Sequence, residues 1–136
     1  MATISEDYVS FETAKLLKEK GFDEYCPESY FKMDKKLKKS GFSEWEKVNE
    51  IKAPTQSLAM KWLREVHKLV ICAEIGNEND KGNTDYSNPD RWYWFFDITN
   101  EKGVVIDTES DYILNKYSSY EETCEAAIKY CLEYLI

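Results

Sequence analysis

The segment Trp92–Ile98, with the sequence WYWFFDI, constrains the fold of this chain more than any other. Its aromatic residues favour a β-strand, in which successive side chains point to opposite faces. The two faces carry Trp92, Trp94, Phe96 and Ile98 on one side and Tyr93, Phe95 and Asp97 on the other. Because both sets are largely apolar, either helices cover both faces of this strand or one aromatic face is left for a partner.

Three segments carry the apolar stripe of an amphipathic helix, and we predict helices at about 10–20, 55–67 and 119–134. Each is preceded by a residue whose hydroxyl can accept hydrogen bonds from the free amides of the first turn. These residues are Ser10, Thr55 and either Ser118 or Ser119. The last helix has the most continuous stripe, which runs from Tyr120 to Leu135.

The other segments predict short strands and one irregular region. Residues 69–75 and 104–107 are rich in β-branched side chains, which favour strands. Residues 23–53 are expected to form a loop or a loose hairpin, with Phe42 and Trp45 as apolar anchors. The order of elements predicts a single α+β domain over residues 1–136, in which three helices pack on a small antiparallel sheet of three to four strands.

The net charge of −8 is unevenly distributed along the chain. Residues 1–73 carry 13 Lys and Arg against 12 Asp and Glu, whereas residues 74–136 carry 5 against 14. An acidic half opposes general binding to nucleic acid. The sequence has no long apolar segment, its N-terminus is polar, and its four cysteines include no Cys-x-x-Cys pair. These features predict a cytoplasmic protein that does not enter membranes.

A single basic cluster interrupts this acidic character. It consists of Lys32, Lys35, Lys36, Lys38 and Lys39, beside the aromatic pair Tyr30 and Phe31. Such a cluster is typical of a solvated turn, and it could also contact phosphate or RNA. We therefore treat Lys35, Lys36, Lys38 and Lys39 as candidate binding residues, together with the aromatic residues Trp92, Tyr93, Trp94 and Phe95.

Motifs that would assign a catalytic activity are missing from the sequence. It contains no phosphate-binding loop and no Gly-x-Gly-x-x-Gly, and His67 is its single histidine. Asp107, Glu109 and Asp111 alternate, so an extended chain would place three carboxylates on one face, where they could hold Mg²⁺ or Ca²⁺. No cofactor and no metal site is predicted beyond this possibility.

Three stretches together resemble a set of small, uncharacterised single-domain proteins carried by phages and mobile elements of gut bacteria. They read ISEDYVSFETAKLLKEKGF (4–22), APTQSLAMKWLREVHKLVI (53–71) and SYEETCEAAIKYCLEYLI (119–136). The resemblance implies a bacterial host cytoplasm and a phage-related role. It implies no activity, cofactor or functional residue.

Three hypotheses about function follow from the sequence. The first is a non-enzymatic binding protein, phage-encoded, that modulates a host or defence protein. The alternative is a protein that binds or sequesters a small nucleotide-like ligand, through the aromatic residues at 92–94 and the lysine cluster. The third is a metal-dependent enzyme that uses the acidic residues at 107–111. A homodimer is the simplest way to bury an uncovered aromatic face.

Overall fold

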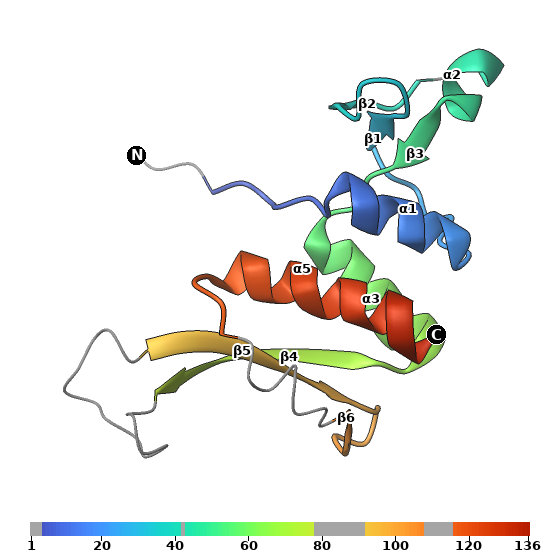
Figure 1. Ribbon diagram of the computed structural model, residues 1–136. Helices are drawn as coiled ribbons and strands as arrows, with labels where there is room; N and C mark the ends of the chain where they lie inside the picture. The colour runs from blue at the N-terminus through green and yellow to red at the C-terminus, as the bar shows by residue number, and fades with distance from the viewer. Residues whose placement is uncertain (1–3, 42, 78–91, 108–115) are drawn as a thin grey trace.

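Two small antiparallel sheets organise the chain (Figure 1). The computed structural model describes residues 4–41, 43–77, 92–107 and 116–136. The first sheet has the strand order β2-β1-β3 and consists of β1 (Glu28–Phe31), β2 (Leu37–Lys39) and β3 (Glu50–Lys52). The second has the order β4-β5-β6 and consists of β4 (Val70–Asn77), β5 (Trp92–Thr99) and β6 (Val105–Asp107).

The helices begin where the sequence places a capping hydroxyl. Ser10 precedes α1 (Phe11–Glu19), Thr55 precedes α3 (Gln56–His67) and Ser119 precedes α5 (Tyr120–Tyr130), and each hydroxyl accepts from the amide three residues later. A π-helical turn, η2 (Cys131–Leu135), extends α5, and a short helix, α2 (Glu44–Val48), begins after Ser43. These bounds confirm the three helices predicted from the sequence.

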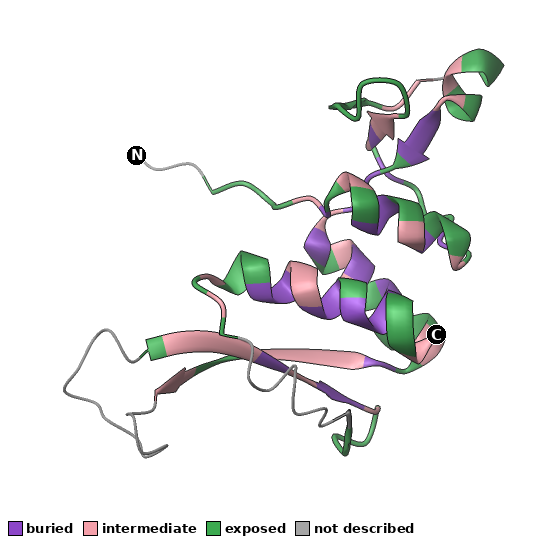
Figure 2. Cartoon of the chain, viewed as in Figure 1, coloured by how far each residue is buried: buried purple, intermediate pink, exposed green. Residues whose placement is uncertain are grey.

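The core lies between the helices and the second sheet. Helices α3 and α5 lie on one face of the β4-β5-β6 sheet, while α1 and the first sheet lie beyond them (Figure 1). The buried residues gather where these layers face one another (Figure 2). The largest completely buried apolar side chains are Leu17, Leu63, Ile98, Ile128 and Leu132. The α+β class with small antiparallel sheets is therefore confirmed, and the strands are divided between two sheets.

The segment 23–53 has more regular structure than the predicted loop or loose hairpin. Strand β1 pairs with β2 on one side and with β3 on the other, so this segment supplies a complete sheet and the helix α2. Trp45, which we expected to be a buried anchor, is 66% exposed, and Phe42 lies outside the described residues. Strands of three or four residues are too short to show a periodic pattern, so their pairing could not be read from sequence.

The C-terminus of α3 offers a test of backbone conformation. Lys68, the residue after this helix, has a left-handed backbone with φ 59° and ψ 33°. This conformation costs a side-chain-bearing residue about 1 kcal/mol relative to glycine. We expect Lys68→Gly to raise the free energy of unfolding by up to about 1 kcal/mol in urea titrations. Lys61→Gly, at an exposed position inside the same helix, should instead lower it by about 1 kcal/mol. A loss of stability in both variants would contradict this expectation.

Candidate ligand-binding pocket

One face of the aromatic strand β5 is covered by α5, as the sequence indicated. The Trp94 ring packs on Tyr120 with 5.6 Å between centroids, and the Phe96 ring packs on Tyr130 at 6.2 Å. Ile98, on the same face, is 1% exposed. Phe96 and Ile98 belong to the core, whereas Trp94 is half-buried and stays a predicted binding residue.

The opposite face of β5 carries Tyr93 and Phe95, and both are half-buried. Their ring centroids are 5.9 Å apart, and the ammonium of Lys116 lies 4.9 Å from the centre of the Tyr93 ring. The Tyr93 ring also lies over Gly76 of β4, where an added Cβ would be 2.8 Å from a ring carbon. Among the described residues, no helix lies on this side of the sheet (Figure 1). A side chain at position 76 would therefore require the Tyr93 ring to move.

The predicted lysine cluster lies at the other end of the molecule, in the first sheet (Figure 1). Lys35 lies over the Phe11 ring, with its ammonium 5.3 Å from the centroid, and Lys38 lies 4.5 Å from the Phe31 centroid while it pairs with Asp34 at 3.0 Å. The structure does not bring the aromatic residues of β5 together with these lysines. The composite nucleotide site predicted from the sequence is therefore not formed.

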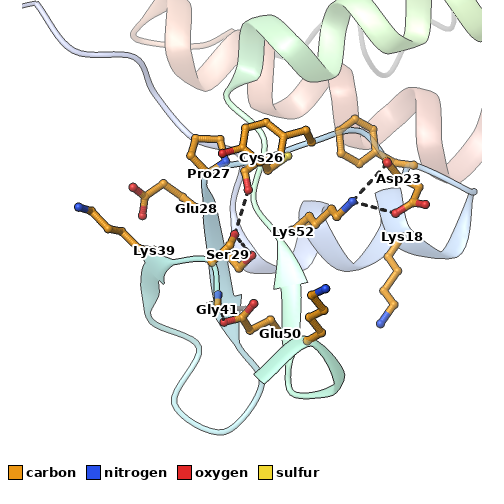
Figure 3. Close-up of a pocket in the computed structure, with 15 residues that line it drawn as sticks. Lys18, Asp23, Cys26, Pro27, Glu28, Ser29, Lys39, Gly41, Glu50 and Lys52 are labelled. Carbon is orange, nitrogen blue, oxygen red and sulfur yellow. Dashed lines mark hydrogen bonds and ion pairs between the residues drawn. The ribbon is translucent and has the colours of Figure 1, made fainter. Parts of the chain in front are cut away.

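A pocket of about 840 Å³ opens between α1, the loop at 22–27 and the first sheet (Figure 3). Its walls come from segments that are distant in sequence, which the pairing of β1 with both of its neighbours brings together. Of the four candidate lysines, only Lys39 lines it. The lining residues are Ala14, Lys18, Phe22, Asp23, Tyr25, Cys26, Pro27, Glu28, Ser29, Lys39, Ser40, Gly41, Lys47, Glu50 and Lys52.

Buried polar groups from β1, β3 and the residues after β2 form the floor of this pocket. Ser29 is 1% exposed, and its Oγ lies 2.6 Å from the Oγ of Ser40. The Ser40 hydroxyl donates to the carbonyl of Cys26 at 2.9 Å. Glu50 is 7% exposed, and its Oε1 accepts from the amide of Gly41 at 2.8 Å. Figure 3 shows Ser29, Gly41 and Glu50 close together between the strands.

Four lysines surround this floor, and one of them is paired. The Lys52 ammonium donates to the Asp23 carboxylate at 2.9 Å and to its carbonyl at 3.2 Å. The hydrogen bond from Lys52 lowers the pKa of Asp23. The exposed ammonium groups of Lys18, Lys39 and Lys47 have no hydrogen bond or ion pair within the described parts of the chain. They come from α1, β2 and α2, and Lys18 and Lys39 lie on opposite sides of the pocket in Figure 3.

Cys26 lies in the pocket wall but is not poised for nucleophilic chemistry. Its side chain is buried, and its thiol faces the carbonyl of Glu24 at 3.6 Å. Desolvation raises the pKa of this thiol to about 11, which outweighs the opposing charge of Lys52. The thiolate is the reactive form of cysteine, so this group is inert near neutral pH. The groups that this pocket presents are consequently charged side chains and hydrogen-bonding atoms.

The metal hypothesis concerns residues that are mostly outside the described structure. Asp107 ends β6, whereas Glu109 and Asp111 lie outside the described residues. Elsewhere, no group of three potential metal ligands occurs in the described ranges.

No described helix is long and apolar enough to span a membrane.

Comparison with known proteins gives no relative from which a function could be transferred. No family model, no curated protein and no solved structure matches this chain. The geometry of the pocket is therefore the basis for assigning a function.

Proposed function

We propose that this protein is a non-enzymatic binding protein that takes a small anionic ligand into the pocket between α1 and the first sheet. The observation that carries the proposal is that three lysines from three separate elements, Lys18, Lys39 and Lys47, line one pocket and have no hydrogen bond or ion pair within the described parts of the chain. The chain as a whole has a net charge of −8, whereas the lining of this pocket holds four lysines against three carboxylates, those of Asp23, Glu28 and Glu50. A bound anion would be attracted by these ammonium groups.

The size of the pocket fits a small molecule. Small-molecule sites typically enclose about 300–1,000 Å³ and place a few polar groups in an otherwise apolar lining. The volume of about 840 Å³ falls in this range. The apolar part of the wall comes from Ala14, Phe22 and Pro27, and the polar part consists of seven charged residues together with serines such as the buried Ser29. Such a pocket can enclose most of a ligand the size of a nucleotide.

Inorganic pyrophosphate is a suitable first probe because it presents charge without other features. We expect the triple variant Lys18→Gln, Lys39→Gln, Lys47→Gln to bind pyrophosphate at least about tenfold more weakly than the unmodified chain in calorimetric titrations. Binding to the unmodified chain should also weaken as salt is added, because the lysines are exposed.

A matched control removes the same charge from elsewhere on the surface. Lys61, Lys102 and Lys129 are exposed, and none of them lines the pocket. Their triple substitution by glutamine should leave the affinity within about twofold, since distant exposed charges are screened. Equal weakening in both triple variants would assign the binding to overall charge and contradict the proposed pocket.

The prediction of a host or defence protein as partner rests on the sequence. Trp92 is 43% exposed and Ile75, close to it in β4, is 54% exposed. It stays a prediction that a partner of unidentified type binds this part of the second sheet. The homodimer, the bacterial cytoplasm and the phage origin also stay predictions. The pocket proposal is independent of them.

A further inference from the structure

The floor of the pocket presents hydrogen-bond acceptors and no free donor. The single hydroxyl hydrogen of Ser40 is used by the carbonyl of Cys26. In the short contact between Ser29 and Ser40, Ser29 must therefore be the donor. Both serine hydrogens are thus used within the protein, and the lone pairs of Ser29 Oγ stay free to accept. The nearby amide of Gly41 is used as well, because it donates to Glu50.

Glu50 adds a carboxylate to this acceptor surface. It is held in place by its position opposite Phe31 in the β1-β3 pairing and by the hydrogen bond from Gly41. No ion pair to this buried carboxylate occurs in the described parts of the chain. A carboxylate has about four lone-pair sites, so it can accept from further N–H groups. A buried charged group is stabilised when such donors are supplied.

From this arrangement we infer that the ligand is a guanine nucleotide, an inference that rests on the proposed function. Its phosphate meets the rim lysines, and its base presents N–H groups to Glu50 and Ser29. Guanine carries two adjacent donors, N1–H and the N2 amino group, and this edge matches a carboxylate that accepts side by side. Adenine and cytosine place a ring acceptor beside their amino group, which would oppose the acceptors of the floor.

Tyr25 provides a surface for the flat face of the base. Its side chain lines the pocket and is 82% exposed, so its ring is accessible to a ligand. Aromatic side chains stack on nucleobases of any type. Stacking would therefore add affinity without selecting a base, and the selection is assigned to Glu50 and Ser29.

Calorimetric titration of the full chain with GMP, IMP, AMP and pyrophosphate tests this inference. IMP lacks only the N2 amino group, so it reports the contribution of that donor. We expect GMP to bind at least about tenfold more tightly than AMP, with IMP between them, because a site built to accept N–H groups rejects analogues that lack them. Glu50→Gln should abolish the preference for GMP and strengthen the binding of pyrophosphate, because a negative charge has been removed from the pocket.

Two further variants separate recognition from folding. Glu28→Gln changes a neighbouring carboxylate of the pocket wall and should keep the preference for GMP. Ser29→Ala should reduce the preference without removing charge, and circular dichroism would verify that each variant is folded. If pyrophosphate binds through the rim lysines but GMP binds no better than AMP, the guanine inference is wrong and the proposed function stands. If neither pyrophosphate nor any nucleotide binds, both are wrong.

Discussion

Replacement of Leu63 by alanine is expected to lower the free energy of unfolding by about 2–5 kcal/mol, the range typical of a fully buried leucine. Leu63 lies on the buried face of α3 and is 0% exposed. Alanine is the better helix former, so the loss would come from the cavity and the lost apolar contacts. Denaturation in urea, followed by far-UV circular dichroism, measures the change as a shift of the midpoint.

Val66 provides the control on the same helix. Its side chain is 54% exposed, so Val66→Ala should change the free energy of unfolding by no more than about 0.5 kcal/mol. The pair distinguishes burial from helix formation because both substitutions introduce alanine into α3. Similar effects in the two variants would mean that α3 does not bury Leu63 as the structure places it.

The helices could be predicted from the sequence because their signals are local. A capping hydroxyl and an apolar stripe lie within one segment, as for Thr55 and the stripe that contains Leu63. The strand β5 could be predicted for the same reason, from its own aromatic residues. Nothing in these signals says which strands pair, so the division into two sheets was not apparent. Sheet pairing depends on contacts between residues distant in sequence, which a local pattern does not contain.

The pocket could not be predicted because lysines that are close together in the sequence need not lie close together in the structure, and the reverse also holds. The lysines at 35–39 were candidate binding residues, yet Lys35 and Lys38 lie over aromatic rings, and of these lysines only Lys39 lines the pocket. Lys18 and Lys47 stand among ordinary charged residues of two helices, and no pattern marked them. Ser29 and Glu50 were equally inconspicuous, because polar residues in short strands are usually exposed.

A network around Glu125 predicts a second large loss of stability. Its Oε1 accepts from the Thr13 hydroxyl at 2.6 Å and from the Ser10 amide at 3.0 Å, so α5 holds the N-terminus of α1. The Ser10 hydroxyl in turn donates to Thr13 and accepts from its amide. Thr13 is completely buried, so water cannot replace a lost acceptor. Glu125→Ala should lower the free energy of unfolding by about 2–3 kcal/mol, as for lost hydrogen bonds to a charged group.

Two variants show whether this loss comes from the network. Glu125→Gln keeps one acceptor oxygen, but its amide would stand at the buried Oε2, which has no partner among the described residues. The loss should therefore be intermediate. Glu121 is an exposed glutamate in the first turn of the same helix, and Glu121→Ala should cost at most about 1 kcal/mol. Equal losses at positions 121 and 125 would show that the carboxylate acts on α5 alone.

The consequences of losing Glu125 should extend to the pocket. The hydroxyl of Tyr30 in β1 donates to the Val9 carbonyl at 2.6 Å, directly before Ser10, so the first sheet is attached at the same junction. Burial, and then the charge of Glu125, raise the pKa of Tyr30, as expected for a hydroxyl close to this carboxylate. Helix α1 supplies Lys18 to one side of the pocket, and the sheet supplies Lys39 and Glu50. Glu125→Ala, which frees the start of α1, should therefore weaken pyrophosphate binding as well as the fold. Leu63→Ala, on α3, should reduce stability and leave the affinity of the folded protein for pyrophosphate unchanged.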